Sequence, residues 1–118
     1  MDQKPIMFVG SAEKSLHSFP AVALQRAWLE LKLLQKGKLP KDWKSMSSIG
    51  LGVCEIRIHR PFEHRVIYVA KFNDAIYVLH AFSKKTQKTP NRHLQQAKKA
   101  YEKIKEIRER ADLYDSIQ

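Results

Sequence analysis

Three runs of strand-forming residues follow one another between residues 52 and 82, and they constrain the fold more than any other feature of the chain. The runs are GVCEIRIHR (52–60), HRVIYVAKF (64–72) and DAIYVLHAF (74–82), and they are rich in β-branched and aromatic residues. The links RPFE and FND are so short that they fit tight turns between antiparallel neighbours. The sequence therefore predicts an antiparallel meander of three strands.

The flanking segments predict one more strand and three helices. Residues 5–9 (PIMFV) favour a short strand, residues 11–17 a short helix capped by Ser11, and residues 20–36 a longer helix with apolar side chains at steps of three and four. Residues 36–52 favour a polar connection, and a basic helix is expected to open at Thr89, with the Thr89 hydroxyl as its cap and Pro90 in its first turn. We predict one α+β domain over residues 1–118, with a small antiparallel sheet, two N-terminal helices and a C-terminal helix, the helices covering one face of the sheet.

Positive charge is concentrated in the last third of the chain. The formal net charge is +10, and between Lys84 and Arg110 ten basic residues face only three acidic ones. We therefore expect a polyanion or an acidic protein as partner. The candidates for contacts with RNA phosphates are Lys88, Arg92, Lys98 and Lys99. The alternative is a helix packed on the core with a solvated lysine face.

Other features bear on the compartment. No apolar run reaches the ~20 residues of a membrane span, and the N-terminal residues do not form a secretion signal. The chain has one cysteine, Cys54, which excludes an internal disulfide and fits a reducing compartment. We expect a cytoplasmic protein without a membrane partner.

Four basic residues of the predicted meander are candidates for one site. Arg57 lies on the polar face of the first strand, Arg65 begins the second, and Lys84 and Lys85 follow the third. Neighbouring strands are about 5 Å apart, so these groups can gather on one sheet face and attract a phosphate. The alternative is that Arg57 pairs with Glu55 or Glu63 and that the lysines are solvated loop charges.

The motifs of this region resemble those of a known family. GVCEIR, RVIY and LHAFSKKTQKTP match the G-[VL]-x-E-[LI]-R, R-[VI]-x-Y and L-H-x-F-x-K-K-T-x-K-T-P motifs of phage-derived, HigB-like toxins in the RelE/ParE superfamily. The third motif matches from Leu79 to Pro90 almost residue for residue, and the resemblance covers roughly residues 5–110.

The resemblance implies the toxin of a type II toxin–antitoxin pair, with a RelE-like fold. Such toxins bind the ribosome and cut mRNA, and a small helix-turn-helix antitoxin neutralises them. By position, Arg57, Arg65, Lys84 and Lys85 are then the active-site residues. The chain departs from many RelE relatives in having Glu55 where they have a lysine, and in lacking a tyrosine after the last strand. The general acid and base therefore stay unassigned.

The residue types are compatible with metal-free RNA cleavage by the 2′-hydroxyl, which needs a base, an acid and cations around the phosphorus. Arginine can supply only charge, whereas a lysine crowded by cations has a lowered pKa, so that Lys84 or Lys85 is a candidate proton carrier. His80 titrates near neutrality and is a further candidate, although its position beside Phe82 also fits a core residue. We expect no metal and no small-molecule cofactor. Two other functions stay open, namely gyrase poisoning without nuclease activity and a non-catalytic RNA- or protein-binding module.

Overall fold

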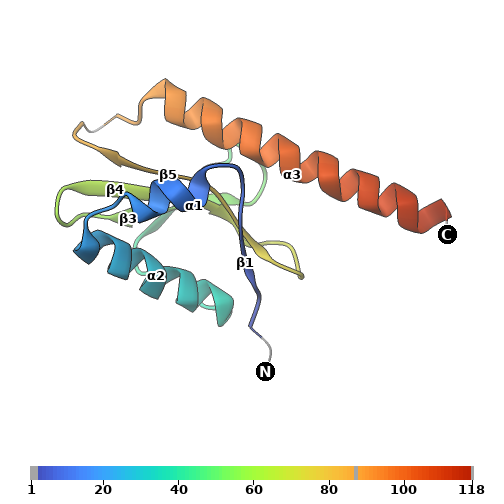
Figure 1. Ribbon diagram of the computed structural model, residues 1–118, viewed down its shortest axis with the longest axis horizontal. Helices are drawn as coiled ribbons and strands as arrows, with labels where there is room; N and C mark the ends of the chain where they lie inside the picture. The colour runs from blue at the N-terminus through green and yellow to red at the C-terminus, as the bar shows by residue number, and fades with distance from the viewer. Residues whose placement is uncertain (1–2, 87, 118) are drawn as a thin grey trace.

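The computed structural model of the protein describes residues 3–86 and 88–117. Gln87, inside the LHAFSKKTQKTP motif, lies outside this part, as do the two residues at the start of the chain and the last one. The described elements, in chain order, are β1 (Ile6–Phe8), α1 (Ala12–His17), α2 (Ala21–Gln35), β2 (Trp43–Ser45), β3 (Val53–Ile58), β4 (Glu63–Val69), β5 (Ile76–Lys84) and α3 (Asn91–Ile117). This is the predicted α+β class (Figure 1).

The five strands form one sheet in the order β1-β5-β4-β3-β2. The meander prediction is confirmed, since β3, β4 and β5 are antiparallel neighbours. The sheet is nevertheless mixed rather than purely antiparallel, because β1 pairs with β5 in parallel, with Ile6 opposite Ile76 and Phe8 opposite Val78.

The edge strand β2 lies inside the segment that the sequence predicts to be a polar connection. Its three residues are all exposed, and they show neither the alternation nor the burial by which a strand is recognised. The segment is extended because it pairs with β3, with Trp43 opposite Ile56 and Ser45 opposite Cys54. Tertiary pairing, rather than local propensity, makes this strand.

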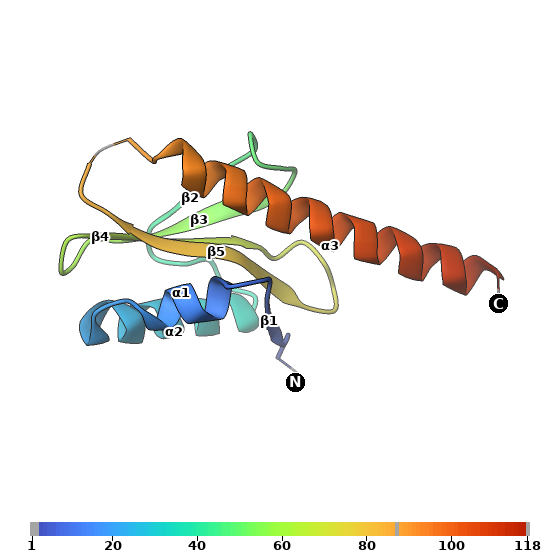
Figure 2. The same cartoon turned by 45° about the horizontal axis from the view of Figure 1, so that its top comes forward.

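The prediction that the helices cover one face of the sheet is wrong. Helices α1 and α2 lie against one face and α3 crosses the other, so the fold has three layers (Figure 2). Strand β4 shows why, because Val66 and Tyr68 pack in the core beneath α1 and α2, whereas Ile67 and Val69 pack in the core beneath α3. A strand that is apolar on both faces needs cover on both.

The helix boundaries agree closely with the sequence signals. Helix α1 begins after Ser11 and α2 begins after Pro20, although the Ser11 side chain makes no capping hydrogen bond. Helix α3 begins at Asn91, one residue later than predicted. The hydroxyl of Thr89, predicted to cap α3, accepts a hydrogen bond from Lys84 Nζ at 3.3 Å and is thus tied to the end of β5.

The last turns of α3 extend beyond the sheet (Figure 1). In the described part of the chain, no helix has both the length and the apolar character needed to cross a membrane.

Candidate functional site

The register of the meander brings the predicted cationic residues together. Arg57 on β3 lies directly opposite Arg65 on β4, and Glu63 on β4 lies opposite Lys84 on β5. Because side chains alternate along a strand, Arg65 is on the same sheet face as Ile67, the face that α3 covers further along. The site therefore stands at the end of that face, beside the turn that leads into α3.

These side chains line an open cavity of about 360 Å³, which we call the polar pocket. Arg57, Arg65, Lys84 and Lys85, the four residues that the sequence proposes for one site, all contribute to it. Its lining consists of Arg57, His59, Glu63, Arg65, Lys84, Lys85 and Thr86, and is mostly polar. His80 does not line it.

Two carboxylates hold the arginines in place. Glu63 Oε1 lies 2.8 Å from Arg65 Nη2, and Glu55 Oε1 lies 3.5 Å from Arg65 Nε and 3.9 Å from Arg57 Nε. Glu55 and Arg65 are almost fully buried. Of the two ion pairs named as the alternative to a phosphate site, that of Arg57 with Glu55 is present, whereas Glu63 pairs with Arg65. Two carboxylates beside four cations leave positive charge in excess.

Several buried polar atoms of this cluster lack a hydrogen-bond partner within the described residues. They are Arg57 Nε, Arg65 Nε and Glu55 Oε2. Both Nε atoms face Glu55 Oε1 in the ion pairs described above, at distances of 3.9 and 3.5 Å and without a hydrogen bond, so the carboxylate neutralises these cations only in part.

Lys84 is the most unusual titratable group of the pocket. Its side chain is only 8% exposed. Burial lowers the pKa of Lys84, the neighbouring Arg65 and Arg57 lower it further, and Glu55 and Glu63 oppose this in part. The direction is the one expected from the sequence, but the main cause is desolvation rather than crowding by other cations. Lys85 is exposed at the same pocket.

His59 is a pocket residue that the sequence analysis did not select. Its Nε2 lies 2.6 Å from Asp42 Oδ2, and its Nδ1 lies 2.9 Å from both carboxylate oxygens of Glu63. These hydrogen bonds, first that to Asp42 and then that to Glu63, raise the pKa of His59. When His59 is protonated, each ring nitrogen donates to a carboxylate, and the hydrogen bonds to Glu63 help to fix the carboxylate that binds Arg65. No sequence signal pairs His59 with Asp42, since 17 positions separate them.

His80 belongs to a different cluster. It is 6% exposed, its Nε2 lies 2.9 Å from Nδ1 of His93, and both rings stack on Phe82. Burial, with a smaller contribution from His93, lowers the pKa of His80 to about 4. The pair joins β5 to the first turn of α3.

The candidate RNA contacts are spread along the start of α3. Arg92 lines another cavity, of about 340 Å³, together with Lys84 and Lys85. Lys88, Lys98 and Lys99 are exposed. None of the three lines the polar pocket or the cavity beside Arg92. Among the described residues, no group of three His, Cys, Asp or Glu side chains could hold a metal ion.

Two comparisons with known proteins bear on the identity of the chain. No curated protein matches it. The sequence model of one family, described as phage derived protein Gp49-like (DUF891), matches residues 14–102, which include the whole meander and the start of α3. That family is associated with RelE-like toxins. The chain belongs to the family of phage-derived Gp49-like proteins.

Proposed function

We propose that the protein is the toxin of a type II toxin–antitoxin pair and that it cuts translated mRNA on the ribosome without a metal ion. The observation that carries this proposal is the polar pocket, in which Arg57, Arg65 and Lys85 surround a buried lysine of lowered pKa. Membership of a family associated with RelE-like toxins supports the same class of activity.

The pocket supplies what transesterification of RNA requires. The 2′-oxygen attacks the phosphorus of its own phosphodiester, the bond from phosphorus to the 5′-oxygen breaks, and the products are a 2′,3′-cyclic phosphate and a free 5′-hydroxyl. Negative charge on the phosphoryl oxygens increases along this path, and the guanidinium groups of Arg57 and Arg65 stabilise it. Their charge is fixed because guanidinium does not deprotonate in proteins.

We assign to Lys84 the role of the base that removes the proton from the 2′-hydroxyl. Its burial at the end of β5 lowers its pKa, which increases the fraction of neutral amine at physiological pH. Lys85, exposed at the mouth of the same pocket, delivers a proton to the departing 5′-oxygen. His59, Glu63 and Glu55 act as positioning residues that fix the two arginines.

The partners follow from the same proposal. The exposed cations at the start of α3, Arg92, Lys98 and Lys99, contact ribosomal RNA phosphates through Coulomb attraction. A small helix-turn-helix antitoxin neutralises the toxin, and the pair acts in the cytoplasm, where translating ribosomes are found.

The test is induction of the protein in growing bacteria, followed within minutes by mapping of transcript 5′ ends. We expect new cuts in translated frames with the wild type, and a loss of at least 100-fold with Lys84→Met. Lys84→Arg separates two roles, because it keeps the charge but cannot carry the proton, and it is expected to be as inactive as Lys84→Met. Lys14→Met is the matched control, since Lys14 is exposed on α1, across the sheet from α3.

Other outcomes contradict the proposal in distinguishable ways. Growth arrest with intact mRNA indicates another target, such as gyrase. Absence of both arrest and cuts from a folded, expressed protein indicates a binding module. Full activity of Lys84→Arg refutes the role of Lys84 as proton carrier and leaves only its charge.

A further inference from the structure

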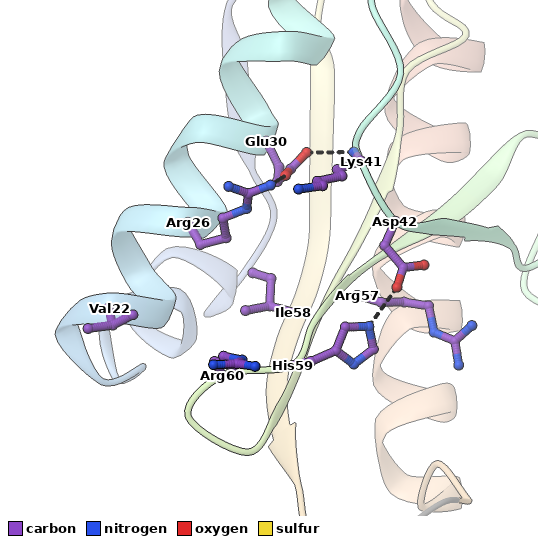
Figure 3. Close-up of a pocket in the computed structure, with 9 residues that line it drawn as sticks. All are labelled: Val22, Arg26, Glu30, Lys41, Asp42, Arg57, Ile58, His59 and Arg60. Carbon is purple, nitrogen blue, oxygen red and sulfur yellow. Dashed lines mark hydrogen bonds and ion pairs between the residues drawn. The ribbon is translucent and has the colours of Figure 1, made fainter.

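A second cleft opens beside the polar pocket, between α2 and the end of β3 (Figure 3). Its volume is about 460 Å³ and its lining is mostly apolar, unlike that of the polar pocket. The lining residues are Val22, Arg26 and Glu30 on α2, Lys41 and Asp42 before β2, and Arg57, Ile58, His59 and Arg60 at the end of β3. We call it the α2 cleft.

The two cavities share part of their walls at the end of β3. Arg57 and His59 line both of them. In Figure 3 the guanidinium of Arg57 points away from α2, while the ring of His59 turns toward Asp42 at the back of the cleft. A linear polymer that binds the polar pocket through one of its units can therefore place the next unit in the α2 cleft, on the other side of Arg57 and His59.

The acidic side chains of the α2 cleft are already engaged. Glu30 is 3% exposed, and its carboxylate forms an ion pair with Arg26 Nη2 and accepts a hydrogen bond from the backbone N–H of Lys41, each at 2.8 Å. Asp42 is bound by His59. Among the described residues, neither Lys41 nor Arg60 makes an ion pair, so the charge left at the rim of the cleft is positive.

An apolar floor with a cationic rim is suited to a nucleotide rather than to an acidic peptide. Val22 is 64% exposed and presents aliphatic surface on which the flat face of a base can pack, while Ile58 is almost fully buried in the lining. Guanidinium planes such as that of Arg60 stack on bases. A pocket of this size accommodates one nucleoside, and a few polar groups at its edge fix orientation.

We propose that the α2 cleft binds the base and ribose of a nucleotide directly adjacent to the phosphate held in the polar pocket. This inference rests on the proposed function, because it assigns the neighbouring subsite of the same RNA strand. The cleft then determines which base is accepted beside the cut, and the polar pocket performs the cut.

The test compares two probes by NMR on the full wild-type chain, since neither inorganic phosphate nor a nucleoside 5′-monophosphate contains a phosphodiester bond that the protein could cut. Inorganic phosphate is expected to shift amide signals of the polar pocket alone. Each of the four ribonucleoside 5′-monophosphates is expected to shift those signals together with the amides of Val22, Ile58 and Arg60. The four affinities should differ, since the base is what the cleft contacts.

Substitutions on α2 provide a matched pair. Val22 is 64% exposed and lines the cleft, whereas Leu29 is 51% exposed on the same helix and does not. Val22→Asp places an anion against the incoming nucleotide and removes its apolar contact, so nucleotide affinity should fall about tenfold while phosphate affinity is unchanged. Leu29→Asp should alter neither.

The outcomes separate this inference from the proposed function. Phosphate binding with no response in the α2 cleft overturns the inference and leaves the nuclease proposal standing. Equal nucleotide affinity for Val22→Asp and Leu29→Asp also overturns it. If Val22→Asp instead abolishes binding of the antitoxin and leaves nucleotide affinity unchanged, the cleft is a protein interface. Failure of both probes to bind, together with intact transcripts after induction, refutes the proposed function itself.

Discussion

The His80–His93 pair makes the protein sensitive to acid in a way that can be calculated. His80 is buried against His93 and Phe82, and its pKa falls from about 6.5 in an unfolded chain to about 4 in the folded one. Between these two values the unfolded chain binds a proton that the folded chain does not. Stability due to neutral His80 is therefore complete above pH 6.5 and is lost as the pH falls toward 4.

The pKa of His80 is lower in the folded than in the unfolded chain by about 2.5, which corresponds to a change of at most about 3 kcal/mol in the free energy of unfolding, at 1.36 kcal/mol for each pKa unit. For a domain of this size that is a large part of the free energy of unfolding. Carboxylates also titrate in this range, so the wild type must be compared with a variant that lacks only this histidine. His80→Leu removes the titration and keeps the site apolar.

The assay is urea unfolding at several pH values between 4 and 8, followed by circular dichroism. The difference in free energy of unfolding between wild type and His80→Leu should shift by about 3 kcal/mol in favour of the variant as the pH falls from 7 to 4. The contribution of His59 to stability depends on pH in the opposite direction, because the pKa of His59 is raised in the folded protein. Its contribution is complete below about pH 6.5 and is lost at higher pH, so His59→Asn should cost more at pH 5 than at pH 8. A difference between wild type and His80→Leu that does not change with pH would refute the reasoning.

Three further substitutions test the packing and the ion pairs of the fold. Gly50→Ala places a methyl group into the ring of Tyr101 and should cost about 1–3 kcal/mol of stability, measured by thermal unfolding. Arg65→Met leaves the buried carboxylate of Glu55 without its nearer cation and should destabilise the protein by about 3 kcal/mol in urea, so that any loss of activity in this variant must be corrected for unfolding. Arg108→Ala removes an ion pair with Asp74 in the β4–β5 loop together with contacts to Tyr77 and Phe72, and a double-mutant cycle with Asp74→Ala should assign less than about 1 kcal/mol to the ion pair alone.

The sequence predicted the meander because its three strands are nearly adjacent and their turns are short. It also contained the signal for the layer arrangement, which we interpreted wrongly. The run HRVIYVAKF is apolar at consecutive positions, and such continuity is typical of a strand covered on both faces. Val66 and Ile67 face opposite cores in the structure. The edge strand β2 had no such signal, since it is defined by its pairing with β3, as of Trp43 with Ile56 and of Ser45 with Cys54, across an intervening loop.

Those parts of the candidate site that depend on the register of the strands could be predicted from the sequence. Arg57 and Arg65 lie opposite each other because the short link after β3 fixes the pairing, and Lys84 follows from the end of the third strand. Asp42 could not be placed, because it reaches the site from a loop whose path the sequence does not determine. His80 was correctly placed beside Phe82, and its catalytic role stays a prediction, although its hydrogen bond to His93 directs it away from the polar pocket.

The cluster of positive charge at the end of β5 has a physical explanation. Burying Lys84 beside Arg65 is costly, because desolvation and like-charge repulsion act in the same direction. The buried carboxylate of Glu55 and the half-buried carboxylate of Glu63 offset part of that cost, and they also fix both arginines. What they do not offset is a net positive charge, because two carboxylates stand against Arg57, Arg65, Lys84 and Lys85. In the function proposed above, the phosphodiester of the RNA supplies the missing negative charge, so that part of the electrostatic cost of gathering these cations is recovered when the substrate binds.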